Sequence, residues 1–115
     1  MTVWREGTSP YDWTKPYFDF QVEQQAAPLR GSPSPGYPEV LRAHNIQGQA
    51  VFQFVVDTIG MVELSSVRVL KSTNPLFALA VYQKMPAMRF EPAQVGGRHV
   101  KEIVQQPYNF NLERR

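Results

Sequence analysis

The feature that most constrains the fold is the stretch GQAVFQFVVD at residues 48–57, in which apolar and polar side chains alternate. All side chains at the even positions from 50 to 56 are apolar, whereas Gln49, Gln53 and Asp57 occupy the other face. Because successive side chains of a strand point to opposite faces, this period predicts a β-strand with one buried side. The following residues up to Gly60 predict a turn, since glycine readily adopts a positive φ.

A second strand is predicted directly after this turn, with a change of phase along it. Val62 and Leu64 share one face, whereas Val67 and Val69 share the other. A β-bulge near Ser65 would turn all four side chains toward one core, because a bulge inserts an unpaired residue. The two strands therefore predict an antiparallel hairpin.

One helix is predicted on each side of the hairpin. Tyr37 and Pro38 before EVLRAH indicate a short helix, because proline in the first turn loses no hydrogen bond. Asn74 and Pro75 indicate the start of the second helix, as N-cap and first helical residue. Pro86 predicts that this helix ends near Met85. Its apolar stripe recurs at helical spacing and consists of Phe77, Val81, Met85 and Met88.

A last strand is predicted over residues 99–112. Its core face holds Val100, Val104, Tyr108, Phe110 and Leu112, its other face holds Lys101, Gln105, Asn109 and Asn111, and the exceptions are Glu102, Ile103 and Gln106. Pro107 lacks an amide donor, which predicts a free strand edge there. The order helix, hairpin, helix, strand predicts an α+β fold of two layers, a three-stranded antiparallel sheet with both helices on one face.

The corner MRFEPA at residues 88–93 joins the second helix to the last strand. We expect Phe90 to return the chain to the core after Pro86 stops the helix, and Pro92 to fix φ for the crossing. The following Gly96 and Gly97 favour a turn into the strand. The corner is therefore interpreted as architecture rather than as a site.

Residues 1–36 predict an extended aromatic and proline-rich arm, which precedes a domain at residues 37–115. Six of the 14 aromatic residues lie within the first 20 positions, and the loop-like AAPLRGSPSPG follows them. One interpretation is a flexible leader with a strand over residues 17–22. The other is a docking arm, because exposed aromatic residues are enriched where partners bind. The candidate partner-binding residues of the arm are Trp4, Tyr11, Trp13, Tyr17 and Phe18.

The composition argues against several classes of function. A net charge of +2 with scattered basic residues does not indicate nucleic-acid binding. The absence of cysteine excludes disulfides and thiolate zinc sites, and neither His44 nor His99 lies in a ligand-spaced motif. No catalytic residue, metal site or cofactor is predicted, so we do not expect an enzyme. The longest apolar run, LFALAVY, is too short for a membrane span, which needs ~20 residues.

Residues 37–112 resemble the TonB C-terminal domain family. The matching features are Tyr37-Pro38, Gly48 before AVFQFVVD, Gly60 in the turn, Lys71-Ser72, Phe77 and Val81 in the second helix, RFEPA, Gly97, and a final strand that ends near Phe110. The resemblance implies a periplasmic domain that follows a membrane anchor and a proline-rich spacer. It also implies that the C-terminal strand pairs with a short segment of an outer-membrane transporter, and it is compatible with a strand-exchanged homodimer.

Such pairing is β-augmentation, in which a partner strand completes the free backbone groups of an edge strand. Side chains that could read the partner are Lys101, Ile103, Gln105 and Asn109.

Two hypotheses about function follow. If the chain is complete, without anchor or spacer, we expect a membrane-extrinsic structural subunit that docks on an integral membrane complex through its aromatic arm and edge strand. Alternatively, it is the excised C-terminal domain of an energy transducer. Both place the protein at a membrane without a span of its own. The side stays open, because MTVWREGTSP lacks a signal peptide, which favours the cytoplasmic face if Met1 is native, whereas the resemblance favours the periplasm.

Overall fold

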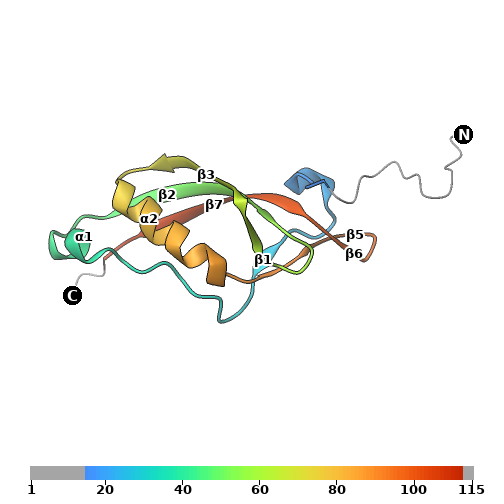
Figure 1. Ribbon diagram of the computed structural model, residues 1–115, viewed down its shortest axis with the longest axis horizontal. Coiled ribbons are helices and arrows are strands. Elements are labelled where there is room, and N and C mark those ends of the chain that lie inside the picture. The colour runs from blue at the N-terminus through green and yellow to red at the C-terminus, as the bar shows by residue number, and fades with distance from the viewer. Residues whose placement is uncertain (1–14, 113–115) are drawn as a thin grey trace, which may run out of the picture.

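The computed structural model describes residues 15–112 and confirms the two-layer α+β fold (Figure 1). Its main sheet has three antiparallel strands in the order β3-β2-β7, with bounds Val62–Ser72, Gly48–Val56 and Glu102–Phe110. Helix α2 (Pro75–Lys84) covers one face of this sheet, and the short α1 (Glu39–Ala43) lies at its end, where Leu41 enters the same core. The predicted residues Trp4, Tyr11 and Trp13 lie outside the described part of the chain.

The remaining elements are all short. They are the 3-10 turns η1 (Asp19–Gln21) and η2 (Met85–Ala87) and the short strands β1 (Ala27–Pro28), β4 (Phe90–Glu91), β5 (Ala93–Val95) and β6 (Arg98–Val100). Strand β1 pairs with β4, and β5 forms a hairpin with β6. The strand predicted over residues 99–112 is therefore divided at Lys101 into β6 and β7. The alternation of side chains between the two faces continues through this break, so the sequence pattern gave no sign that the strand is divided.

The main core follows the predicted periodicities. The even positions of β2 from 50 to 56, including Phe52 and Phe54, are fully buried and share a core with Phe77 and Val81 of α2. The Asn74 side chain accepts a hydrogen bond from the Leu76 amide at 2.9 Å, as expected of an N-cap. Helix α2 ends at Lys84, and Pro86 lies in η2, so the predicted start and end of this helix are both confirmed.

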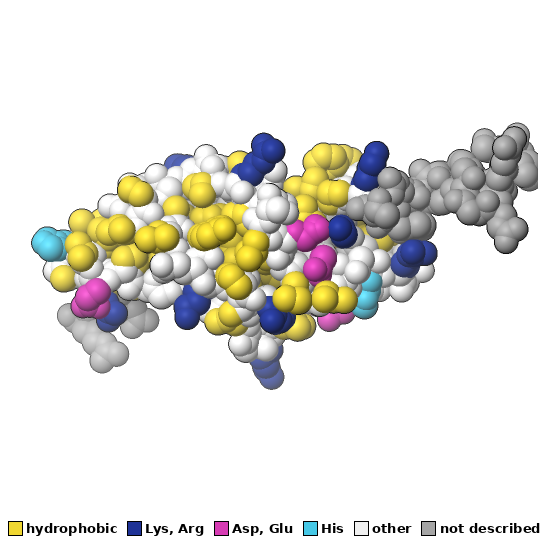
Figure 2. All heavy atoms as spheres, in the orientation of Figure 1, with side chains coloured by type: hydrophobic (Ala, Val, Ile, Leu, Met, Phe, Trp, Pro, Cys, Tyr) yellow, Lys and Arg dark blue, Asp and Glu magenta, His cyan; other side chains and the backbone are white. Residues whose placement is uncertain are grey.

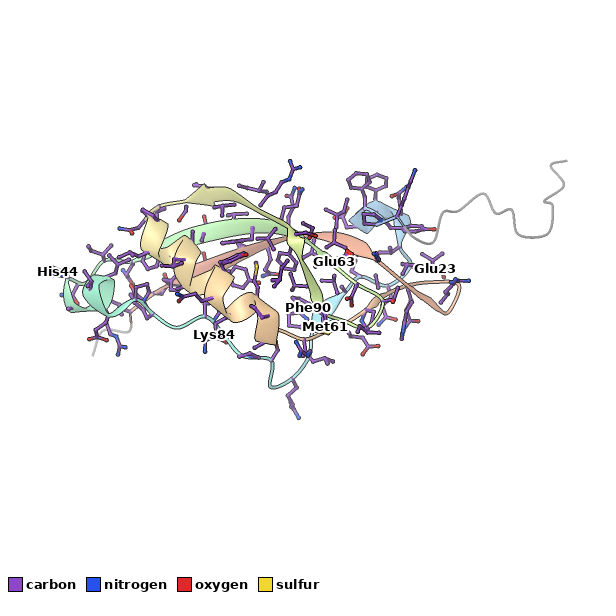
Figure 3. The ribbon with its side chains drawn as sticks, viewed as in Figure 1. Glu23, His44, Met61, Glu63, Lys84 and Phe90 are labelled. Atoms are coloured by element: carbon purple, nitrogen blue, oxygen red, sulfur yellow. The ribbon has the colours of Figure 1, made fainter. Side chains whose placement is uncertain are left out.

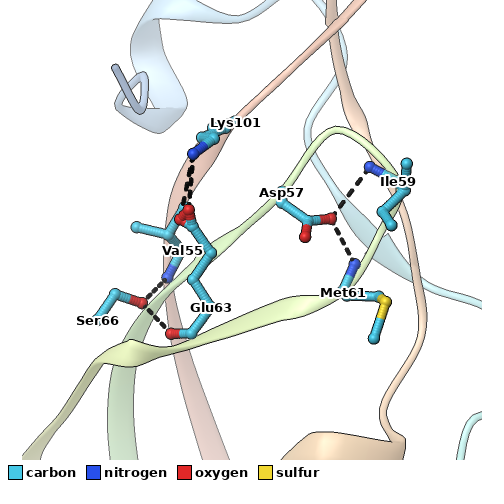
Figure 4. A network of polar contacts seen from close by, with 7 residues as sticks. All are labelled: Val55, Asp57, Ile59, Met61, Glu63, Ser66 and Lys101. Carbon is cyan, nitrogen blue, oxygen red and sulfur yellow. Dashed lines mark hydrogen bonds and ion pairs between the residues drawn. The ribbon is translucent and has the colours of Figure 1, made fainter. Parts of the chain in front are cut away.

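The predicted bulge interrupts β3. Gln53 pairs with Arg68 but Val55 pairs with Glu63, so residues 64–67 stand opposite a single residue of β2. The Ser66 hydroxyl replaces part of the lost ladder, since it accepts from the Val55 amide at 2.8 Å and donates to the Glu63 carbonyl at 2.5 Å (Figure 4).

The side chains around this bulge follow the prediction only in part. Val67 packs against the core as predicted. Val69 lies opposite the core residue Phe52 and so shares its face of the sheet, as predicted. Neither Leu64 nor Val69 is buried, however, because they are 41% and 51% exposed. Leu64 lies within the bulge, where the ladder is interrupted, and Val69 lies on an edge strand that has no further strand beside it.

The outer face of α2 is also apolar. Leu76, Leu79 and Tyr82 are between 38% and 49% exposed on this helix, and Figure 2 shows hydrophobic side chains gathered over the half of the molecule that α2 covers. The helix is thus apolar on both sides rather than clearly amphipathic.

Residues 17–32 run along the rest of the molecule. Gln24 bridges to Gln94, and the Ser32 hydroxyl accepts a hydrogen bond from the Arg89 amide at 3.0 Å. The strand expected over residues 17–22 is wrong: Tyr17 alone makes a bridge, and η1 follows, because the Gln21 side chain accepts from the Phe18 amide at 2.9 Å and closes the turn. Tyr17 is buried with Ala93 and Val100 in a second, smaller core.

The corner at Phe90 ties the hairpin turn to the body. Phe90 is buried, packs against Phe54 with ring centroids 5.8 Å apart, and donates its amide to the Gly60 carbonyl at 2.8 Å. Figure 3 shows Phe90 beside Met61 of the turn. The expectation that Phe90 returns the chain to the core is confirmed.

Candidate partner-binding edge of the sheet

Strand β7 forms one edge of the main sheet. It pairs with β2 in an unbroken register from Gly48 opposite Phe110 to Val56 opposite Glu102. In an antiparallel ladder, the backbone groups of successive residues point alternately toward the partner strand and away from it. The Ile103 amide points away from β2, since it donates to the Tyr17 carbonyl at 2.8 Å. The same alternation directs the amides and carbonyls of Gln105 and Asn109 outward.

Within residues 15–112, the arm pairs with one end of this edge. Tyr17 bridges to Glu102 in parallel orientation, and its amide donates to the Lys101 carbonyl at 2.8 Å. Beyond this bridge the outward positions are Gln105, Pro107 and Asn109, and Pro107 has no amide to present there. Because the missing amide would point away from β2, Pro107 breaks no hydrogen bond with that strand. An edge strand tolerates proline at such an outward position.

Two cavities flank the open stretch. The first has a volume of about 310 Å³ and is lined by the strand at residues 102–106, by Phe18, Asp19, Gln25 and Ala26 of the arm, and by Gln53. The second has a volume of about 380 Å³ and is lined by residues 107–111 together with Ser34, Pro35 and Tyr37. Among the described residues, the stretch of β7 from Gln105 to Asn109 thus carries no added strand and lines the two cavities.

The structure brings the predicted β7 side chains together on the sheet face opposite α2. The Gln105 amide donates to the Gln53 side chain at 3.2 Å, and Asn109 accepts from Gln49 at 3.0 Å. Lys101 is held by Glu63 in a half-buried ion pair of 2.7 Å (Figure 4), so its charge is already partnered within the chain.

The arm residues within the described part of the chain divide between core and surface. Phe18 lines the first cavity beside Ile103 and is 50% exposed. Tyr17 is 7% exposed and packs within its own chain, so its side chain offers no surface to a partner.

Glu102 is a site residue that sequence reasoning did not select. It is 2% exposed, lines the first cavity, and accepts a hydrogen bond from the Ala26 amide at 2.7 Å. Burial raises the pKa of Glu102 above its usual range, the Ala26 hydrogen bond opposes this rise, and the charge of Asp19 adds to it. The available signal was its position on the core-facing register between Val100 and Val104, where a carboxylate is unexpected.

The raised pKa of Glu102 predicts a pH-dependent stability. The folded state holds this proton more tightly than the unfolded chain, so the contribution is complete below the ordinary pKa of 4.5 and is lost as pH rises through the raised value. Urea unfolding of the wild type and Glu102→Gln from about pH 4 to about pH 8 should show this loss in the wild type alone. Glu39→Gln, at an exposed carboxylate paired with Arg42, should follow the wild type. Parallel profiles for the wild type and Glu102→Gln would contradict the assignment.

Neither a metal-binding cluster nor a membrane-spanning helix is found among the described residues. Over residues 15–112, no three His, Asp or Glu side chains come close enough together to hold a metal ion. His44 lies at the end of α1, and its Nδ1 donates to the Val40 carbonyl at 2.8 Å. None of the helices in the described part of the chain combines the length and the apolar character that a bilayer-spanning helix needs.

Known proteins share this architecture. The family model of the Gram-negative bacterial TonB protein C-terminal matches residues 33–112. Protein TonB of Pseudomonas aeruginosa is 33% identical over 89 residues, which cover 76% of this chain and 25% of that protein. The chain thus spans about a quarter of the length of that relative. The solution NMR structure of the Pseudomonas aeruginosa TonB CTD has a TM-score of 0.63 and 32% identity, and covers 79% of this chain and 90% of that chain. The chain belongs to the TonB C-terminal domain family.

Proposed function

We propose that this chain is the periplasmic, non-enzymatic C-terminal domain of a TonB-type energy transducer, and that it binds an extended segment of an outer-membrane transporter along β7. The observation that carries this proposal is the open edge from Gln105 to Asn109, with outward backbone groups between two cavities. Membership of the TonB C-terminal domain family supports the class of partner.

Strand addition suits this edge for a physical reason. Unpaired amide and carbonyl groups on a sheet edge gain hydrogen bonds when an extended peptide aligns with them, and the neighbouring side chains add selectivity. The bridge between Tyr17 and Glu102 already occupies the start of the edge in the same manner. It limits the partner to the stretch that begins near Gln105, so the paired segment is short.

The alternative, a structural subunit that docks through its aromatic arm, has less support. Tyr17 is buried in its own chain, which leaves Phe18 and Phe20 as the exposed aromatic pair of the described arm. Their rings stack 5.6 Å apart, and Phe18 lies beside the proposed strand site rather than away from it. A homodimer is a further proposal, in which a second copy of the chain would supply the strand added at the same edge.

Replacing Gln105 by proline tests the strand site. This change removes an outward amide but no hydrogen bond to β2, so the fold should persist. We expect affinity for peptides that correspond to short segments of outer-membrane transporters to fall at least about tenfold, measured by isothermal titration calorimetry.

Gln105→Ala is the matched control, because it removes the same side chain and keeps the amide. It should bind within about threefold of the wild type. Asn109→Pro repeats the test at the second outward amide. Unchanged affinity in both proline variants, with wild-type circular dichroism, would rule out strand addition at β7.

A further inference from the structure

The cavity at the arm end of β7 is formed by the open strand edge itself. It is lined by residues 102–106 of β7, by Phe18 and Asp19 on one part of the arm, and by Gln25 and Ala26 on the next. Figure 1 shows η1, in blue, beside the end of β7, and the two elements are in contact. A strand that pairs at Gln105 would therefore run beside this cavity, since Gln105 lines it.

The charged residues that line the cavity are both acidic. They are Asp19 and Glu102, and glutamines supply most of the other polar groups, while the lining residues, all within the described part of the chain, include no lysine or arginine. Glu102 is 2% exposed and has a backbone amide, that of Ala26, as its hydrogen-bond donor. Lys101 is adjacent in sequence but pairs with Glu63 at 2.7 Å and does not line the cavity. The cavity thus has an excess of negative charge.

The electrostatics of Glu102 agree with this description. Burial, and then the nearby charge of Asp19, raise the pKa of the Glu102 carboxyl against the effect of the Ala26 hydrogen bond. A positive charge brought into the cavity would favour the ionised form of Glu102, because opposite charges at short range stabilise each other.

Phe18 adds an aromatic surface to the same cavity. Its ring is 50% exposed and is stacked on Phe20 with an interplanar angle of 5°. Lysine and arginine side chains bind to the faces of aromatic rings, and their apolar stems cover such rings in water. A neutral apolar side chain could contact Phe18 too, but it would bring no positive charge to the two carboxylates.

We infer that the strand received by β7 carries a lysine or arginine side chain that enters this cavity and binds Asp19, Glu102 and the ring of Phe18. The inference rests on the proposed function, since it requires a strand on β7. It adds that one side chain of the partner strand is basic.

Host peptides of sequence Thr-Val-Thr-X-Thr-Val-Thr, with X as lysine, methionine or glutamate, test the inference on the whole chain. Alternating β-branched residues favour the extended state, so X is the main difference among the peptides. In isothermal titration calorimetry at about 0.05 M salt, the lysine peptide should bind at least about tenfold more tightly than the methionine peptide, and the glutamate peptide most weakly. The preference should shrink at about 0.5 M salt.

Asp19→Asn should reduce the preference for lysine over methionine to below about threefold, because one of the two carboxylates is removed without loss of shape. Glu39→Gln is the matched control, since Glu39 is an exposed carboxylate on α1 and lies outside the cavity, and it should keep the preference. Glu102→Gln serves as a second variant, with circular dichroism to check that the arm and sheet remain folded.

The outcomes separate this inference from the proposed function. If the lysine and methionine peptides bind equally and Gln105→Pro weakens both, the inference of a basic side chain is wrong and strand addition at β7 is retained. Binding that Gln105→Pro does not weaken would overturn both. An unchanged lysine preference in Asp19→Asn and Glu102→Gln would place the basic side chain elsewhere and overturn the inference. Absence of binding by every peptide up to about 5 mM would contradict both proposals.

Discussion

Replacing Phe77 by alanine should lower the free energy of unfolding by about 3–5 kcal/mol, since truncation of a fully buried phenylalanine removes its transfer energy and leaves a cavity. Phe77 has no exposed surface and stacks on Phe110 with ring centroids 4.4 Å apart. The edge of Tyr37 meets the same ring at 5.8 Å. Helix α2, the end of β7 and the entry to α1 therefore depend on this one side chain.

Urea unfolding followed by far-ultraviolet circular dichroism would measure the change. Phe20→Ala is the matched control, because the same truncation at a side chain that is 80% exposed should alter stability by less than about 0.5 kcal/mol. A loss at Phe77 below about 1.5 kcal/mol would mean that the core collapses around the missing ring or that the ring is not buried as described.

The Phe77 cluster also supports the candidate edge on β7. Tyr37 and Phe110 both line the second cavity, and Tyr37 additionally donates its hydroxyl to the Ile46 carbonyl. Removal of Phe77 takes away the ring on which both aromatic side chains rest. The geometry of the cavity next to Asn109 thus depends on packing beneath the sheet.

Local patterns were sufficient to predict the main elements. The alternation in β2, the Asn74 cap and the proline after α2 each act within a few residues, and the structure confirms them. The strand predicted over residues 17–22 failed because the Phe18 amide donates a hydrogen bond to the Gln21 side chain and closes a turn, which composition does not reveal. The division at Lys101 was hidden because β6 and β7 keep one alternation while they join different sheets.

The candidate site was predictable only as a strand face. Ile103, Gln105 and Asn109 follow from alternation along β7, since a period of two fixes which side chains share a face. The approach of Asp19 to Glu102 depends on where the arm crosses β7, and sequence separation gives no information on such a contact. Glu102 alone left a signal, as a carboxylate on a face otherwise lined by core residues.

Gly60→Ala should lower the free energy of unfolding by about 3 kcal/mol or more, through two effects that act together. Gly60 has φ +86°, where an L-residue is strained by ~1–2 kcal/mol. A Cβ at this position would lie 2.0 Å from the Phe90 carbonyl oxygen, which is backbone and cannot rotate away. The corner would have to move, and the hydrogen bond from the Phe90 amide to the Gly60 carbonyl would weaken. Asp57 holds the turn itself, since its carboxylate accepts from the Ile59 and Met61 amides at 3.0 and 2.9 Å (Figure 4).

Gly31→Ala separates backbone strain from collision in the Gly60 prediction. Gly31 has nearly the same φ, +85°, but a Cβ there would meet nothing within 4 Å. We expect this control to lose about 1–2 kcal/mol, the strain alone, so the difference between the two variants reports the contact with Phe90. Equal losses in urea unfolding would show that the corner yields freely and that Phe90 does not fix the hairpin turn. A clearly larger loss at Gly60 would show that the corner residues 88–93 and the β2–β3 turn are one structural unit, because a methyl group on the turn then acts through the backbone of the corner.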